Sequence, residues 1–169
     1  SAAELSIESV VFSFRNHART VVKGDGSPAP RLLVTPERRY RLMKEAGIQA
    51  ILSPEFTQDW AQTPAEVFAR DFLGETLKAN RVIVGFNYCF GRKAEGRTQH
   101  LLEFGDRFGF EVEIVPPFQV AGEEVSSTRI RNAILAGNLE EARRLLGRPH
   151  ELSGVVVSGD GRGKSLGFP

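Results

Sequence analysis

Four short runs of β-branched and aromatic residues, separated by segments with helical spacing, constrain the fold of this chain more than any other feature. The most continuous run is RVIVGF at residues 81–86, and the others lie at residues 7–14, 48–52 and 110–115. Runs of this kind are typical of buried strands. Because they alternate with helical segments, the sequence predicts an α/β domain with a mainly parallel sheet.

Helix-start and turn signals occupy the first half of the chain between these runs. Thr35, followed by a proline, favours the start of a helix that Gly47 ends. A second helix is expected after a capping box that Glu66 completes. Residues 15–31 are predicted to form a long loop, because turn-forming residues gather at 24–30.

The second half of the chain continues the pattern. A helix is expected over residues 101–108, and residues 126–146 predict a pair of helices that meet at a Gly-Asn turn. Asn138 and Glu141 are spaced for a second capping box. Residues 155–158 predict one more strand, followed by a glycine-rich loop.

The composition narrows the class of partner. Lys and Arg number 22 against 21 Asp and Glu, a net charge of +1, so we expect no nucleic-acid partner. No apolar run approaches the roughly 20 residues that a membrane span needs, so we expect no membrane partner. Cys89 is the single cysteine, which excludes an intrachain disulfide, and we expect it to be a small buried hydrophobe. A single cysteine suits a reducing compartment.

In parallel α/β sheets, ligands bind beyond the carboxyl ends of the strands. One candidate there is the segment SSTRIR at residues 126–131, where Ser126, Ser127 and Thr128 begin a helix. Free backbone N–H groups and the helix dipole attract anions, and Arg131, about one turn further, can fork onto phosphate oxygens. The structural alternative is a capped helix with a solvated arginine face.

The second candidate follows the strand at residues 81–86. Gly85 and Gly91 allow close approach of the backbone to a ligand, and Asn87 offers a donor and an acceptor to a heterocycle or a ribose. Phe90 is one of three alternating aromatic residues that can line a pocket. The alternative, which the local pattern favours, is a strand end with core aromatics and a turn.

The third candidate is Asn16 and His17, just after the first strand. His17 can contact a phosphate or act as an acid or base, but the alternative is a loop histidine bonded to backbone. His100 and His150 stand alone, so no pair of histidines has metal-ligand spacing and we expect no metal site.

The glycine-rich segment at residues 159–169 can cradle a phosphate. Its GRGKS stretch is superficially similar to a Walker A loop, but Ser158 stands where that loop has its first glycine, so the P-loop interpretation is rejected.

Three stretches together, VIVGFNYCFG, EEVSSTRIRNAILAGNLEEARRLLGRPHELSG and GDGRGKSLGFP, resemble the bacterial bifunctional riboflavin kinase/FMN adenylyltransferase (FAD synthetase) family. The resemblance covers nearly the whole chain. It implies a Rossmann-like nucleotidyltransferase domain at residues 1–147, which makes FAD from FMN and ATP with Mg²⁺. It also implies a linker and the first strand of a β-barrel riboflavin kinase domain at residues 148–169.

The resemblance also implies roles for residues. Three residues are expected to act on the ATP phosphates: Arg131, Ser127 and Thr128. Seven are expected at the nucleotide and flavin site: Gly85, Asn87, Phe90, Gly91, Ser126, Asn16 and His17. Six match the nucleotide loop of the kinase domain: Gly159, Gly161, Arg162, Gly163, Lys164 and Gly167.

Two family motifs are expected but missing from this sequence: the GxFDGxHxGH-like loop that precedes the first strand, and the Thr-Ala-Asn that continues the kinase motif. The chain is therefore expected to be an internal fragment of a cytoplasmic enzyme. We expect adenylyl transfer from ATP to FMN, with riboflavin phosphorylation by the mostly absent second domain. The alternative is an inactive fragment that at most binds nucleotide or flavin weakly. We expect the substrates of the enzyme to be small molecules, and the sequence does not determine its oligomeric state.

Overall fold

The computed structural model describes residues 7–22 and 31–155, together with residues 157, 159, 162 and 167. Its strands form two parallel pairs. The first pair joins β1 (Val10–Phe12) to β2 (Ala50–Leu52), and the second joins β3 (Arg81–Gly85) to β6 (Glu111–Val115). The predicted alternation of strands with helices and the parallel pairing are confirmed.

The prediction of one mainly parallel sheet is wrong for the described part of the chain, which contains four separate two-stranded sheets. Two of them are short antiparallel pairs: β4 (Cys89–Phe90) with β5 (Gly96–Arg97), and β7 (Gln119–Val120) with β8 (Glu123–Glu124). The parallel pairs are linked by side-chain packing instead of backbone hydrogen bonds. Phe12 of β1 reaches Phe72, with ring centroids 4.7 Å apart.

The helix α2 (Pro36–Glu45) begins as predicted. The Thr35 hydroxyl accepts a hydrogen bond from the backbone N–H of Arg38 at 3.3 Å, and proline occupies the first turn. The helix ends at Glu45, two residues before Gly47, whose φ is +87°.

A short helix, α1 (Ala18–Val22), replaces part of the predicted loop, so that prediction is wrong for these residues. The turn-forming residues that favoured a loop lie at 24–30, outside the described residues. Tertiary contact supports the helix, since the side chain of Gln58 in α3 (Gln58–Gln62) donates to the Val21 carbonyl at 3.0 Å.

The predicted capping box at Glu66 is not formed. Pro64 occupies the N-cap of α4 (Ala65–Val67), and the Thr63 hydroxyl donates to the carbonyl of Asp59 at 2.8 Å. The carboxylate of Glu95, distant in sequence, accepts the N–H of Ala65 at 2.9 Å. Glu66 instead pairs with Arg107. A long-range acceptor therefore supplies the cap that local spacing assigned to Glu66.

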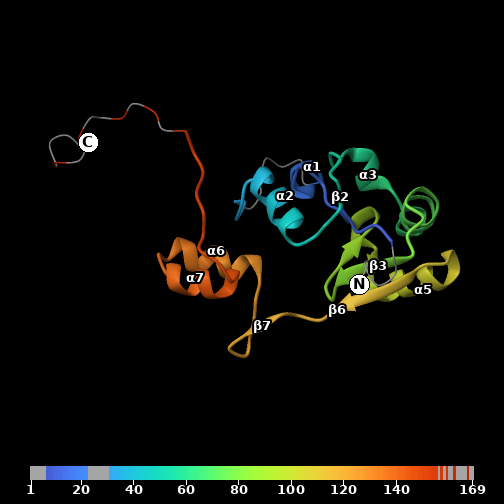
Figure 1. Cartoon of the computed structure of the whole chain (residues 1–169). Coiled ribbons are helices and arrows are strands. Elements are labelled where there is room, and N and C mark those ends of the chain that lie inside the picture. The colour runs from blue at the N-terminus through green and yellow to red at the C-terminus, as the bar shows by residue number, and fades with distance from the viewer. Residues whose placement is uncertain are drawn as a thin grey trace.

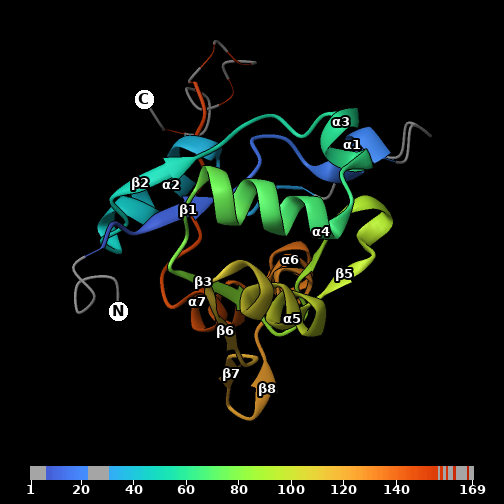
Figure 2. The same ribbon diagram turned by 90° about the vertical axis from the view of Figure 1, so that its right-hand side faces the viewer.

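The main core lies between a π-helix, η1 (Phe68–Thr76), the helix α5 (Thr98–Phe108) and the β3–β6 pair. Figure 2 shows α5 in front of β3 and β6. The buried residues of this core are Ala65, Phe68, Ala69, Leu73, Phe90, Leu101 and Phe110. The predicted helix at 101–108 and the strand at 110–115 are confirmed within one to three residues.

The predicted helix pair is confirmed as α6 (Ser127–Leu135) and α7 (Leu139–Leu146). Asn138 caps α7, because its side-chain oxygen accepts the N–H of Glu141 at 3.1 Å. The reciprocal half of the capping box is wrong, since the Glu141 carboxylate pairs with arginines. The pair stands apart from the β3–β6 sheet and is joined to it through the β7–β8 hairpin (Figure 1).

Beyond α7 the described residues form no strand, so the strand predicted at residues 155–158 is wrong at 155 and 157. A strand needs a hydrogen-bonding partner, and Val155 is 89% exposed here. Residues 156 and 158 lie outside the described part of the chain.

Candidate functional site

The start of α6 presents hydroxyl groups beside free backbone donors. Ser126 is the N-cap, and its hydroxyl accepts the N–H of Arg129 at 3.2 Å. Ser127 and Thr128 follow in the first turn and are exposed. Because one of the three hydroxyls caps the helix, the other two remain as donors to a ligand. Together with the first N–H groups and the helix dipole they favour an anion.

Arg131 lies one turn further along α6. Its Nε donates to the carbonyl of Arg31 at 2.7 Å, which holds the side chain beside the segment that precedes α2. Among the described residues the Arg131 guanidinium makes this one hydrogen bond, and it uses Nε. The two terminal nitrogens therefore remain available to bind phosphate oxygens.

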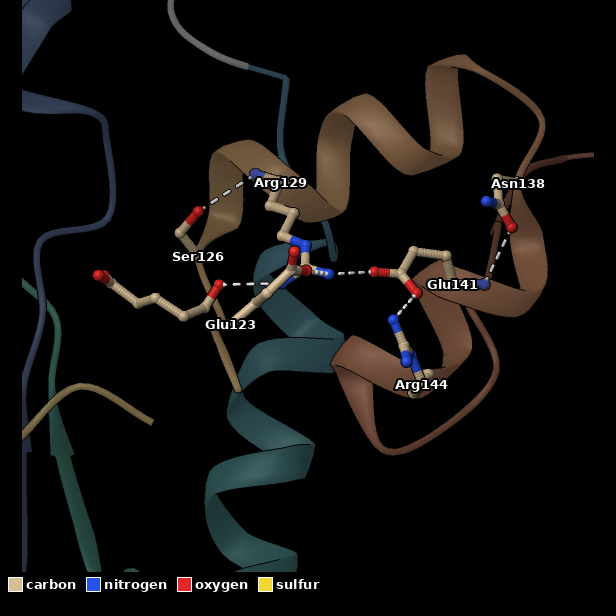
Figure 3. Close-up of polar contacts among 7 residues, drawn as sticks. Glu123, Ser126, Arg129, Asn138, Glu141 and Arg144 are labelled. Atoms are coloured by element: carbon tan, nitrogen blue, oxygen red, sulfur yellow. Dashed lines mark hydrogen bonds and ion pairs between the residues drawn. The ribbon is translucent and has the colours of Figure 1, made fainter. Parts of the chain in front are cut away.

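Arg129, on the same helix, differs from Arg131 because carboxylates already neutralise its charge. It pairs with Glu123 of β8 and, at 2.5 Å, with Glu141 of α7 (Figure 3). Burial by itself raises the pKa of Glu141, but hydrogen bonds from Arg144 and Arg129 outweigh that effect and lower it. The Glu141 carboxylate is therefore charged at neutral pH, and the arginine of α6 with uncompensated charge is Arg131.

The segment at residues 85–91 has an exposed part and a buried part. Gly85 and Asn87 are exposed beyond the end of β3. Cys89 is exposed as well, which corrects the prediction that it is buried. Side chains alternate along the two-residue strand β4, so Phe90 points into the core and Cys89 points away from it.

Phe90 and Gly91 build the core beneath this exposed edge. Phe90 is 7% exposed and stacks on Tyr88, with ring centroids 5.5 Å apart. Burial raises the pKa of Tyr88 to about 12, with a smaller contribution from Cys89, so its hydroxyl stays neutral. A Cβ on Gly91 would lie 2.6 Å from Cα of Ala65. The absence of a side chain at Gly91 thus permits close packing against α4.

Asn16 and His17 follow β1. The Asn16 side chain clamps the backbone of Phe56: Nδ2 donates to the Phe56 carbonyl at 3.1 Å, and Oδ1 accepts the Phe56 N–H at 2.6 Å. The His17 carbonyl accepts bonds from the N–H and the hydroxyl of Thr20, at 2.9 and 2.7 Å. His17 is exposed. Asn16 therefore fixes the turn that presents His17.

Residues 16–17 and residues 85–91 follow the carboxyl ends of the parallel strands β1 and β3, whereas residues 126–131 follow β8 of the antiparallel hairpin. Among the described residues no hydrogen bond or ion pair joins residues 126–131 to residues 85–91. Two hollows of the surface lie away from these segments. One of about 510 Å³ lies beside the amino ends of β3 and β6 and is lined in part by Asn80, Asp106 and Glu111. Another of about 380 Å³ lies between α3 and η1. The predicted site residues line neither.

The predicted kinase-type loop is only partly described. Gly159, Arg162 and Gly167 are described, and Gly167 has a φ of +80°. Gly161, Gly163 and Lys164 lie outside the described residues.

Two arginines near these segments were not predicted as site residues. Arg39 of α2 donates to the carbonyl of Phe14 at 3.3 Å, at the end of β1. Arg129 lies within the SSTRIR segment, but the sequence predicted no role for it because its partner Glu141 is on the next helix. The charge pattern of α6 alone does not identify that partner.

Comparison with known proteins identifies the class. The FAD synthetase family model matches residues 1–129, and the riboflavin kinase family model matches residues 146–169. The chain belongs to the FAD synthetase family, whose members are bifunctional riboflavin kinase/FMN adenylyltransferases, which confirms the predicted resemblance.

Individual relatives agree with this assignment. The bifunctional riboflavin kinase/FMN adenylyltransferase of Listeria monocytogenes is 33% identical over 99% of this chain and 52% of its own length. The enzyme of Haemophilus influenzae is 32% identical over 99% of this chain and 54% of its length. The chain thus spans about half the length of these relatives.

A solved structure has the same fold. It is described as a macrolide-efflux protein from Streptococcus pneumoniae, and it matches with a TM-score of 0.81 and 30% identity over 99% of this chain and 54% of that one. In the part of the chain that the structure describes, no helix has the length and apolar character needed to cross a bilayer. The same residues contain no cluster of three or more potential metal ligands.

Proposed function

We propose that residues 1–147 carry out the FMN adenylyltransferase reaction. The FMN phosphate oxygen attacks the α-phosphorus of ATP, the bond to the β-phosphate breaks, and FAD and pyrophosphate are the products. The reaction needs no protein nucleophile, so catalysis comes from positioning and from charge stabilisation on the phosphates. The observation that carries the proposal is the start of α6, where exposed hydroxyls, free backbone donors and an uncompensated arginine converge in a chain of this family.

The proposed roles follow from exposure and charge. Arg131, Ser127 and Thr128 hold the ATP phosphates, and Ser126 shapes the turn that presents them. Gly85 and Asn87 face the nucleotide or flavin, and Phe90 and Gly91 support that edge from the core. Asn16 orients His17 toward the ligand.

Mg²⁺ is proposed to arrive with ATP. The described residues offer no cage of carboxylates for a resident ion, and Mg²⁺ is commonly held by one or two carboxylates together with substrate phosphates. Bound in that way, the ion would neutralise charge on the phosphates.

Residues 148–169 are proposed to be the linker and the beginning of a riboflavin kinase domain, in keeping with the family match at residues 146–169. The nucleotide loop proposed there comprises Gly159, Gly161, Arg162, Gly163, Lys164 and Gly167. Phosphorylation of riboflavin is proposed for the whole protein.

The competing proposal is a chain that binds nucleotide or flavin weakly and does not turn over. Figure 1 shows α6 well away from β3, and this separation favours it, because adenylyl transfer needs both substrates within reach of one another.

The test is incubation of the chain with FMN, ATP and Mg²⁺, followed by chromatography for FAD, with the Listeria enzyme in parallel. Arg131→Ala is compared with Arg143→Ala, which removes an exposed arginine from α7. FAD from the chain and from the Arg143 variant, with a loss on the order of 10²–10³-fold in the Arg131 variant, supports the transferase proposal. No FAD from the chain beside an active Listeria enzyme supports the competing proposal.

A further inference from the structure

Arg129 connects the first turn of α6 to two other elements. Its Nη2 pairs with Glu141 of α7 at 2.5 Å and also with Glu123 of β8. Its Nη1 donates to the carbonyl of Glu124 at 3.4 Å. Figure 3 shows the guanidinium between these carboxylates, with Arg144 on the far side of Glu141. One side chain thus joins a helix start, a neighbouring helix and a hairpin.

The Arg129–Glu141 pair is more enclosed than the other ion pairs among the described residues. The side chains of Arg129 and Glu141 are 25% and 19% exposed, whereas both partners of the Arg107–Glu66 pair are about half exposed, at 55% and 47%. Glu141 uses its other oxygen for Arg144. An ion pair that is partly shielded from water and belongs to a network constrains geometry more than an exposed pair does.

The backbone of Arg129 acts on the same turn. Its N–H donates to the hydroxyl of Ser126 and closes the N-cap. The main chain of this residue therefore shapes the turn, while its side chain ties that turn to α7 and the hairpin. The chain between β6 and α6 contains the short β7–β8 hairpin, and this network ties the helix start to that hairpin and to α7, in addition to the bond from Arg131 to the Arg31 carbonyl.

We propose that Arg129 is a positioning residue. It holds the first turn of α6 against α7 and the β7–β8 hairpin, so that Ser127, Thr128 and Arg131 face a phosphate with fixed geometry, and it does not itself contact the ligand. This inference rests on the proposed function of that turn and adds the device that aligns it.

The test uses Arg129→Met, which keeps the apolar stem, Glu141→Gln, which keeps the shape, and the double variant. Arg143→Met on the exposed face of α7 is the matched control. Hydrogen exchange of the amides at residues 127–131 is measured together with the affinity for MgATP by calorimetry. Each single variant is expected to speed exchange and weaken MgATP roughly three- to tenfold, and the double variant is expected to be no worse than either, as for two coupled residues.

The outcomes separate the possible roles of Arg129. Weaker MgATP binding in Arg129→Met with unchanged binding in Glu141→Gln would mean direct contact with phosphate and would overturn the proposal. Unchanged exchange in both variants would overturn it too. If the wild-type chain binds no MgATP while exchange responds as expected, the positioning role is supported and the proposed function fails. If Arg129→Met does not fold, Glu141→Gln alone tests the positioning role: faster exchange at residues 127–131 supports it, and unchanged exchange overturns it.

Discussion

Arg38 and Glu151 are held together across 113 positions of sequence: Nη2 of the arginine donates to Oε1 at 2.8 Å, and Nε lies 2.7 Å from Oε2. Arg38 belongs to α2, and Glu151 follows α7. Two nitrogens of a planar guanidinium against two carboxylate oxygens fix direction as well as distance. The contact therefore anchors the chain that leaves α7 to a helix near the beginning of the sequence.

Glu151→Gln is expected to loosen this anchor, because a neutral amide loses the ion pair with the guanidinium and has one acceptor oxygen where the carboxylate has two. Hydrogen exchange at residues 148–152 should rise several-fold while exchange in α5 stays unchanged. Glu45→Gln is the control, since Glu45 also contacts Arg38, at 3.2 Å, but lies within α2 itself. Equal exchange in the two variants would show that the bidentate contact does not anchor the chain.

Acid should release the same anchor. The hydrogen bond from Arg38 lowers the pKa of Glu151, an effect that partial burial opposes. A carboxylate with a depressed folded-state pKa stabilises the fold above its unfolded pKa, about 4.3 for glutamate. That contribution is lost as the pH falls below this value through the folded-state pKa. Exchange at residues 148–152, corrected for its intrinsic pH dependence, should therefore increase below pH 4 in wild type but not in Glu151→Gln.

Gly91→Ala is expected to destabilise the fold more than Gly109→Ala. Both glycines have positive φ, +75° and +83°, so alanine incurs a backbone cost of about 1–2 kcal/mol at either position. A Cβ at Gly91 would also meet Ala65 at 2.6–2.7 Å, whereas nothing lies within 4 Å at Gly109. Overpacking adds about 1–3 kcal/mol. Urea unfolding of the two variants measures this difference, and equal losses would refute the packing role of Gly91.

Ser126→Ala and Ser127→Ala should separate stability from ligand binding. Ser126 caps α6, so its loss is expected to cost about 1 kcal/mol of the free energy of unfolding. Ser127 is exposed, and its replacement should change stability by no more than about 0.5 kcal/mol while weakening MgATP binding. Thermal unfolding and calorimetry of both variants test the assignment. A stability loss confined to Ser127→Ala would contradict it.

The two tyrosines should titrate separately. A hydrogen bond with Ser53 lowers the pKa of Tyr40, while burial raises the pKa of Tyr88 to about 12. Absorbance near 295 nm should therefore rise in one step below pH 10 and another near pH 12. The second step should vanish in Tyr88→Phe. Because the pKa of Tyr88 is raised in the folded state, the fold should also lose stability between about pH 10, the unfolded value, and about pH 12. A single step near pH 10 would show that Tyr88 is exposed.

Local signals in the sequence located several elements because the interactions behind them are local. Thr35 and Asn138 cap helices within three residues of themselves, and the β-branched run at residues 81–86 pairs as a parallel strand. The family could also be predicted from the sequence, because its motifs are short stretches of residues that are contiguous in the chain. The hydroxyls at the start of α6 followed from the same local rule.

Tertiary structure decided what spacing alone could not. Glu95 replaced Glu66 as a cap for α4, since a long-range carboxylate reached the N–H of Ala65. Cys89 is exposed and Phe90 buried because the pairing of β4 with β5 set which face meets the core.

The sequence by itself determined the family, the alternation of strands and helices, and the residue types at the candidate site. Only the tertiary structure decided which arginine of α6 keeps its charge for a ligand. Arg129 and Arg131 are equivalent in the sequence pattern of α6, but carboxylates from α7 and β8 neutralise Arg129. Within the described residues, Arg131 bonds to the backbone carbonyl of Arg31 and pairs with no carboxylate. Electrostatic partners come from the folded chain and not from neighbours in sequence, so this distinction requires the fold.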